Sequence, residues 1–106
     1  MDYKEKYKIN FQMFGGPVYS GRKKGENANK KINLNNLNDE FKYIEIEIPD
    51  DTYSINSSFF LGLFGPIIKK FNSMDSFLNK YQFKCNEDFM VIIKQFVQIA
   101  LLEKRN

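Results

Sequence analysis

The segment Phe41–Pro49 constrains the fold of this chain more than any other. Its core alternates strictly between apolar and acidic residues. The alternating residues are Ile44, Glu45, Ile46, Glu47 and Ile48. Because successive side chains of a β-strand point to opposite faces, one face of this strand is apolar and the other is charged. We therefore expect a sheet that is buried on one face and wetted by solvent on the other.

Two further segments, Tyr7–Met13 and Tyr81–Cys85, alternate in the same way. In the first, the odd positions from Tyr7 to Met13 are predicted to be buried. Gly15 and Gly16 predict a tight turn into a short strand over residues 17–20. The wet face would combine lysines with the glutamates of residues 41–49. Because opposite charges on neighbouring strands stabilise pairing, we expect these glutamates beside a lysine-bearing strand.

Helices are predicted in the second half of the chain. A helix beginning near Ser57 has one continuous apolar face, formed by Phe60, Leu63, Phe64, Ile67, Ile68 and Phe71. Pro66 removes a backbone donor, so a kink or a break is expected there. A short helix follows over Ser73–Lys80. Asn86 is expected to cap a long helix that ends near Lys104.

These elements predict one α/β domain over residues 1–106. Its fold would have two layers, with a mixed β-sheet of about four strands and helices packed on one face. Residues 1–6 are expected to be a flexible N-terminus. Residues 21–31 are expected to be a basic loop rich in Gly, Lys and Asn, and a poor helix over Glu26–Leu37 is a second interpretation of this region.

Positive charge is concentrated near the N-terminus. Residues 1–31 carry eight Lys or Arg against three acids, whereas residues 32–106 carry eight against ten. Arg22, Lys23 and Lys24 are candidate weak anion contacts, for nucleic acid or for an acidic partner. The spacing from Gly16 to Lys23 is similar to that of a phosphate loop, but Lys23 stands where the metal-binding hydroxyl belongs. Nucleotide hydrolysis is therefore excluded at this loop.

The residue inventory argues against an enzyme. The chain has no His and a single Cys, Cys85, which excludes imidazole catalysis, zinc held by several thiolates and an internal disulfide. We assign no catalytic residue, no metal site and no cofactor. The charged N-terminus and the lack of a long apolar run predict a cytoplasmic protein without a membrane association.

Ser57 and Ser58 lie where the predicted apolar helix begins. A serine at this position caps a helix by accepting a hydrogen bond from a backbone N–H. Capping explains one serine. A helix N-terminus also stabilises added negative charge, so Ser58, and after it Ser57, are candidate phosphorylation sites.

The order of strand, turn, Asn56-Ser57-Ser58 and apolar helix resembles the STAS fold of anti-sigma factor antagonists. In that family an Asp-Ser-Ser-Gly-Leu-Gly motif opens the helix, and a partner kinase phosphorylates the second serine. By position, Asn56 stands at the Asp and Phe59 at the first glycine. The chain is also similar to a bacterial STAS-like family of unknown function, through its glycine-containing N-terminal loop and the run from Ser57 to Gly65.

The resemblance implies a non-catalytic regulatory domain that binds a protein partner, with a GHKL-type ATPase acting as a kinase as the implied partner. The implied partner-binding residues are Ser54, Asn56, Ser57, Ser58, Phe59 and Gly62. Two alternatives remain open from the residues themselves. The first is a nucleic-acid-associated or phage-related accessory protein that acts through the basic loop 22–31. The second is a homodimer formed through the wet sheet face or an exposed Phe59.

Overall fold

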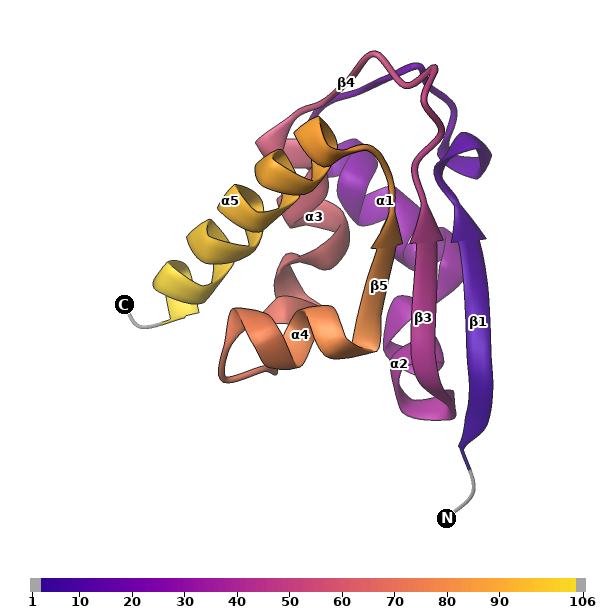
Figure 1. The fold of residues 1–106 in the computed structure, drawn as a ribbon, viewed down its shortest axis with the longest axis vertical. Coiled ribbons are helices and arrows are strands. Elements are labelled where there is room, and N and C mark those ends of the chain that lie inside the picture. Colours follow the sequence, from indigo (N-terminus) through magenta and orange to yellow (C-terminus); the bar gives the residue numbers. More distant parts are fainter. Residues whose placement is uncertain (1–2, 105–106) are drawn as a thin grey trace.

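The computed structural model describes residues 3–104 and has an α/β fold (Figure 1). Three strands form the main sheet in the order β1-β3-β5, and two short strands form a second sheet. The strands are β1 (Lys4–Asn10), β2 (Val18–Tyr19), β3 (Phe41–Glu47), β4 (Ser54–Ile55) and β5 (Tyr81–Lys84). All strand pairs among residues 3–104 are parallel, so the prediction of a mixed sheet is wrong in strand direction.

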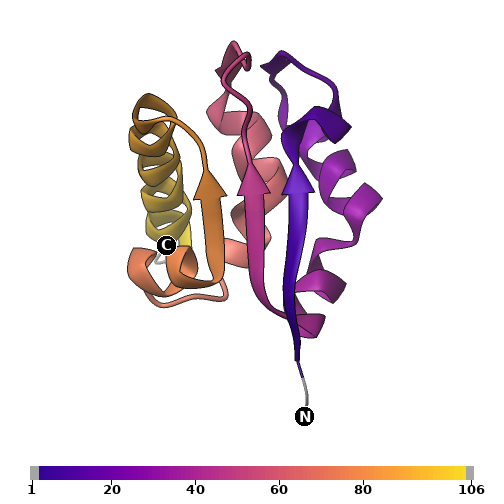
Figure 2. The same cartoon turned by 45° about the vertical axis from the view of Figure 1, so that its right-hand side comes forward.

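The helices lie on one side of the main sheet, as Figures 1 and 2 show. They are η1 (Phe11–Phe14, a 3-10 turn), α1 (Arg22–Ile32), α2 (Leu34–Glu40), α3 (Ser57–Ile68), α4 (Met74–Lys80) and α5 (Glu87–Lys104). Parallel neighbours cannot be joined by a hairpin, so the chain crosses from one strand to the next through these helices. The helices therefore cover one face and leave the other to solvent.

The register of the main sheet confirms the expected pairing of charges. Lys8 lies opposite Glu45, and Glu47 lies opposite Lys84. The Nζ atom of Lys6 is 3.4 Å from Oε1 of Glu45. Glutamates on the central strand are thus flanked by lysines from both neighbours, which stabilises this parallel order on the wet face.

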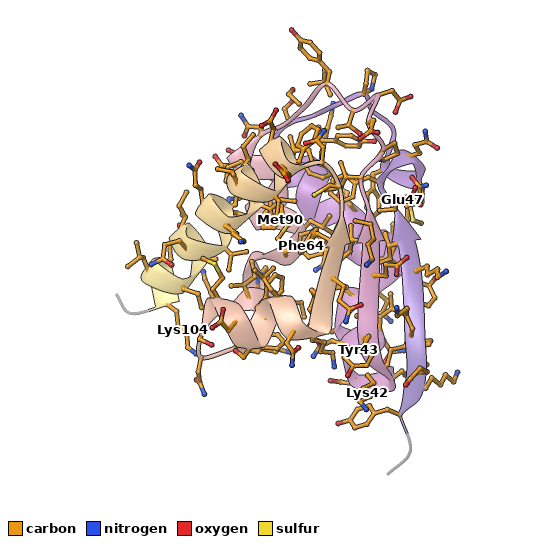
Figure 3. The ribbon with its side chains drawn as sticks, viewed as in Figure 1. Lys42, Tyr43, Glu47, Phe64, Met90 and Lys104 are labelled. Carbon is orange, nitrogen blue, oxygen red and sulfur yellow. The ribbon has the colours of Figure 1, made fainter. Side chains whose placement is uncertain are left out.

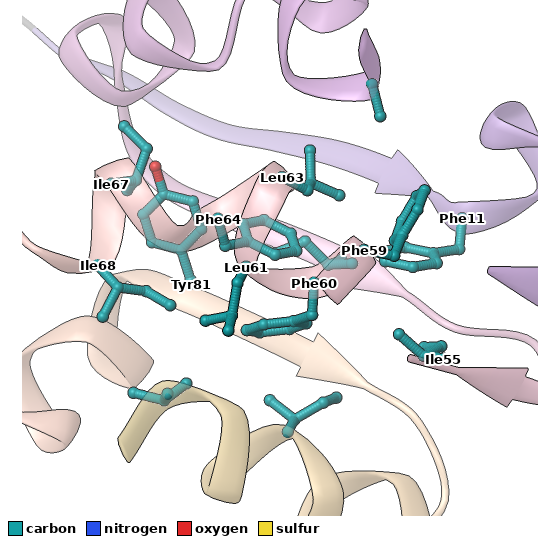
Figure 4. Packing of buried hydrophobic residues seen from close by; sticks show 14 of the residues in the cluster. Phe11, Ile55, Phe59, Phe60, Leu61, Leu63, Phe64, Ile67, Ile68 and Tyr81 are labelled. Carbon is teal, nitrogen blue, oxygen red and sulfur yellow. The ribbon is translucent and has the colours of Figure 1, made fainter. Parts of the chain in front are cut away.

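Helix α3 lies in the middle of the helical layer, between α1 and α5, and packs against the sheet (Figure 4). The buried residues of α3 lie on all sides of the helix. They are Phe59, Phe60, Leu61, Gly62, Leu63, Phe64, Gly65, Ile67 and Ile68. Figure 3 shows Phe64 between helices and sheet, and Lys42, Tyr43 and Glu47 along β3. The apolar face that spacing predicted is buried from Phe60 to Ile68, and other residues such as Phe59 are buried as well, because α3 has neighbours on several sides. The helix continues past the exposed Pro66, so no break occurs there.

Residues 22–32 form helix α1, so the prediction of a basic loop over 21–31 is wrong. Gly25 and Ala28 are buried on this helix, and Nδ2 of Asn29 donates to the carbonyl oxygen of Leu63 in α3 at 2.8 Å. Asn33, with φ at 51°, ends α1 in the left-handed conformation and separates it from α2. Packing against α3 therefore compensates for the low helix propensity of this segment.

The N-terminal strand is shifted relative to its prediction. It begins at Lys4, so residues 4–6 belong to the sheet rather than to a flexible terminus, while residues 1–2 lie outside the described residues. It ends at Asn10, whose side chain accepts from the N–H of Gln12 and starts the η1 turn. Tyr7 and Met13 are consequently 37% and 41% exposed instead of buried.

The C-terminal half follows the sequence pattern closely. Ser73 and Ser76 form reciprocal capping hydrogen bonds at the start of α4. Oδ1 of Asn86 accepts from the N–H of Phe89 at 2.9 Å, which confirms Asn86 as the cap of α5. Among residues 3–104, none of the helices is both long enough and apolar enough to span a bilayer.

Candidate partner-binding site at the start of helices α1 and α3

Two helices begin side by side at one end of the molecule. The strands β2 and β4 pair in parallel, with Tyr19 opposite Ile55. The N–H of Asn56 then donates to the carbonyl oxygen of Tyr19 at 2.7 Å. Each strand leads within a few residues into a helix, β2 into α1 and β4 into α3. The N-terminus of α1 therefore lies next to the N-terminus of α3.

Asn56, and not a serine, caps helix α3. Its backbone is extended, and its Oδ1 accepts from the N–H of Ser58 at 2.7 Å. The prediction of a serine cap is therefore wrong. An amide side chain accepts this hydrogen bond as well as a hydroxyl does, so neither serine hydroxyl is used as the cap. Ser58 is exposed and Ser57 is half-buried.

The helices α1 and α3 approach to backbone contact through two glycines. A β-carbon on Gly25 would overlap the carbonyl oxygen of Phe59, and one on Gly62 would overlap the carbonyl oxygen of Arg22. Ser58 stands four residues before Gly62, on the same face of α3. The Ser58 side chain is thus on the side of α3 that faces the first turn of α1.

The first turn of α1 provides positive charge at this place. Arg22, Lys23 and Lys24 are all exposed there. The helix is preceded by Gly21, with φ at 93° and without a side-chain cap. Unsatisfied N–H groups at a helix start and nearby cations both favour an anion. The first turn of α1, which carries the three predicted anion-contact residues, therefore lies beside the helix that begins with Ser57 and Ser58.

Two of the predicted partner-binding residues are buried within the domain. Phe59 is 2% exposed, because its ring packs against the rings of Phe11, Phe14 and Tyr19. Gly62 is buried against α1. The prediction that Phe59 is exposed is therefore wrong. The remaining predicted residues, Ser54, Asn56, Ser57 and Ser58, are at least partly exposed.

Sequence reasoning missed the support that Tyr19 gives to this end of the molecule. The buried Tyr19 hydroxyl donates to the carbonyl oxygens of Phe11 and Gly15, at 3.0 Å each. Burial, and then the negative charge of Asp51, raise the pKa of Tyr19. The hydroxyl therefore stays protonated and joins η1 to β2. A tyrosine next to a Gly-Gly turn is only a weak signal of such a role.

The geometry provides little for catalysis or metal binding. Residues 3–104 contain no cluster of three or more His, Cys, Asp or Glu side chains that could hold a metal ion. Cys85 is half-buried, and burial raises the pKa of its thiol, which lowers its reactivity. The exposed cations and the backbone N–H groups at the two helix starts favour an anionic group at this end of the molecule.

Comparison of the chain with protein-family models, with curated proteins and with solved structures finds no match.

Proposed function

We propose that this chain is a non-catalytic regulatory domain of STAS-like type, which binds a protein partner at the paired starts of α1 and α3. Phosphorylation of Ser58, with Ser57 as the second candidate, would switch that binding. The observation that carries the proposal is the position of Ser58. It is exposed at the start of α3, on the face that meets the first turn of α1.

The chemistry of a phosphate supports this site. A phosphoserine carries a charge of about −1.5 to −2 and three strong acceptor oxygens. At Ser58 these oxygens would lie beside the N–H groups of two helix starts and the side chains of Arg22 and Lys23. The modification would therefore lower the positive charge of this surface by about two units without unfolding the domain. A partner that reads surface charge would distinguish the two forms.

The phosphate would come from ATP bound by a partner kinase. The Ser58 Oγ would form a bond to the γ-phosphorus, the bond to ADP would break, and the hydroxyl proton would pass to a base on the kinase. A GHKL-type ATPase is the partner that the STAS resemblance implies. A cytoplasmic location is part of the same proposal.

The arrangement of the elements supports the STAS-like part of the proposal. Helices cover one face of a small sheet, and a strand and a turn lead into the Asn56-Ser57-Ser58 helix start. Asn56 acts as the cap at the position of the family's Asp. Because Asn lacks the negative charge of Asp, we expect the kinase to recognise this segment through shape and hydrogen bonding.

The test is mass spectrometry of the protein purified from its native host, followed by partner capture with Ser58→Asp. We expect phosphate on Ser58 and a partner whose capture changes with Ser58→Asp. Ser57→Asp separates the two serines. Asn72→Asp adds the same charge at an exposed, remote position and should change nothing. Unmodified serines together with identical capture by all variants would end the proposal.

Nucleic-acid binding is the second candidate, and the charge of α1 favours it. Lys23, Lys24, Lys30 and Lys31 are all exposed on this helix. Phosphate contacts release counterions, so binding to generic duplex DNA or RNA would weaken steeply with salt. The measurement is a fluorescence anisotropy titration at several salt concentrations. A flat signal at low salt would remove this candidate.

A further inference from the structure

A groove with an apolar interior and cationic wall opens between η1 and α1. Its volume is about 430 Å³, enough for one large side chain. Phe14 and Phe59 line it, with ring centroids 6.5 Å apart. Lys24 and Lys31 also line it, and they share one face of α1 because seven residues make about two helical turns. Nζ of Lys31 donates a hydrogen bond to the carbonyl oxygen of Met13 at 3.0 Å. The groove therefore suits an apolar side chain accompanied by negative charge.

The loop between β3 and β4 carries the complementary features. Tyr53 is 80% exposed, and the exposed Asp50 and Asp51 precede it. The backbone of this loop is nevertheless fixed, because the N–H of Tyr53 donates to the carbonyl oxygen of Pro17 at 2.8 Å. A tyrosine on a fixed backbone loses little entropy on binding, which makes it an effective anchor. The domain itself gives this side chain little to pack against.

Neither set of charges forms an ion pair within the described residues. Among residues 3–104 the ion pairs are Lys4–Glu40, Lys6–Glu45 and Lys69–Glu103. The aspartates of the loop and the lysines of the groove take part in none of these. Both sets are therefore available to an intermolecular contact.

The loop and the groove are neighbours on the surface. Gly15 lines the groove, and it also lines an adjoining hollow bordered by Asp51 and Thr52. Figure 1 shows η1 and the β3–β4 loop at the same end of the molecule, beyond the carboxyl ends of the strands. A two-fold axis passing near Gly15 would place each loop over the groove of the other copy. Adjacent complementary patches are the requirement for a self-complementary dimer.

We infer that two copies of this chain associate reciprocally, with Tyr53 of each copy entering the Phe14–Phe59 groove of the other. Asp50 and Asp51 then face Lys24 and Lys31 across the interface. This inference goes beyond the proposed function, because it requires neither a kinase nor a modified serine. It also explains two features at once, an apolar groove walled by lysines and an exposed tyrosine preceded by aspartates.

The first test is sedimentation equilibrium of the unmodified protein from micromolar to millimolar concentration. The expected result is a concentration-dependent dimer that weakens as salt is added. Tyr53→Ser should raise the dissociation constant about thirtyfold or more, the usual effect of losing a central anchor residue. Its unfolding midpoint should not change, because the side chain is exposed. A protein that is monomeric throughout this range would overturn the inference and leave the groove to other occupants.

The second test reverses the charges on each side. Lys24→Glu with Lys31→Glu, and separately Asp50→Lys with Asp51→Lys, should each give a monomer. An equimolar mixture of the two variants should form a heterodimer. In this heterodimer the glutamates of the changed groove face the lysines of the changed loop. The other contact joins an original groove to an original loop. Restoration on mixing cannot result from damage to the fold, which circular dichroism and an unfolding curve check separately.

The matched control is Lys23→Glu with Lys30→Glu. It makes the same change of charge at the same spacing on the same helix, at two exposed positions outside the groove lining. This control should still dimerise. Dimerisation that survives reversal of Lys24 and Lys31, or that is lost equally in the control, would contradict the inferred interface. Either result leaves the proposed role of Ser58 intact, because that role is read from phosphate and partner capture.

Discussion

Gly25 of α1 lies against the backbone carbonyl of Phe59 in α3, with no room for a β-carbon between the two helices. This contact sets the distance between the helices and so brings their first turns together. The backbone of Arg22 lies against Gly62 as a consequence, one helical turn beyond Ser58. The candidate site thus depends on a residue that has no functional group of its own.

Gly25→Ala should destabilise the domain by about 1–3 kcal/mol, because the new methyl group meets backbone that cannot move aside easily. Gly65→Ala is the matched control on α3. Its β-carbon would come only within 3.9 Å of the Leu61 β-carbon, an ordinary contact. That variant should be stabilised by about 0.5–1 kcal/mol, since alanine favours the helix. Urea unfolding curves measure both values, and equal effects at the two positions would contradict the close packing.

Helix α1 also shows where sequence reasoning fails. The glycine and the two asparagines of α1 argue for a loop by local propensity. The same Gly25 is required where two helices cross, and that crossing is formed with residues more than thirty positions away. Local sequence does not contain this information. Tertiary packing therefore decided the structure of this segment.

Patterns with a clear period predicted the structure well. The isoleucines of β3 are all buried, and the caps of α4 and α5 lie where Ser73 and Asn86 were expected. A local period or a cap depends only on neighbours in sequence, so it can be read directly. Helix α3 shows the limit. From Phe59 to Ile68 the helix contains no polar side chain. The sequence therefore does not show which sides of the helix are buried, or that Phe59 is among the buried residues.

For the candidate site, the sequence predicted Ser58 and Arg22 but not their proximity. That proximity follows from the parallel pairing of β2 with β4, two strands of two residues each. Such short strands have no alternation to recognise. The Gly15-Gly16 turn predicted a short strand after it but gave no sign that this strand pairs with β4.

Asn56→Ala should cost about 1 kcal/mol of stability, because the N–H of Ser58 loses its acceptor. Asn56→Asp keeps the acceptor and adds negative charge at the helix start, so it should be at least as stable as the original. Guanidinium unfolding at neutral pH compares the three proteins. An alanine variant as stable as the original would show that the cap contributes nothing.

Phe59→Ala should destabilise the domain by about 3–5 kcal/mol, the range for removing a buried aromatic ring. The ring packs against Phe11 and Tyr19, so the loss leaves a cavity in the core. Tyr53→Ala removes an aromatic ring that is 80% exposed, and it should change stability by less than about 0.5 kcal/mol. Thermal unfolding of both variants separates the effect of a core aromatic ring from that of a surface one.

Tyr81 should make the domain sensitive to alkaline pH. Its hydroxyl donates to Oδ1 of Asn38 at 2.7 Å, and burial, then the charge of Asp39, raise its pKa in the folded state well above the ordinary value of 10.0. The unfolded chain therefore releases this proton first. Below pH 10.0 the Tyr81 hydroxyl is protonated in both states, so it causes no change of stability with pH. Above pH 10.0 the free energy of unfolding falls as the pH rises, by at most about 1.4 kcal/mol per pH unit.

Tyr81→Phe removes this proton, so its unfolding free energy should fall less steeply above pH 10.0 than that of the original. Some slope should remain, because the pKa of Tyr19 is raised in the same direction. The variant should also be less stable at neutral pH, by about 1 kcal/mol for the lost hydrogen bond. Urea unfolding from pH 8 to pH 11 measures the slopes, and about 1.4 kcal/mol per unit is the largest difference one group can make. Tyr53→Phe is the exposed control, and parallel curves for the original protein and Tyr81→Phe would contradict the role assigned to the buried hydroxyl.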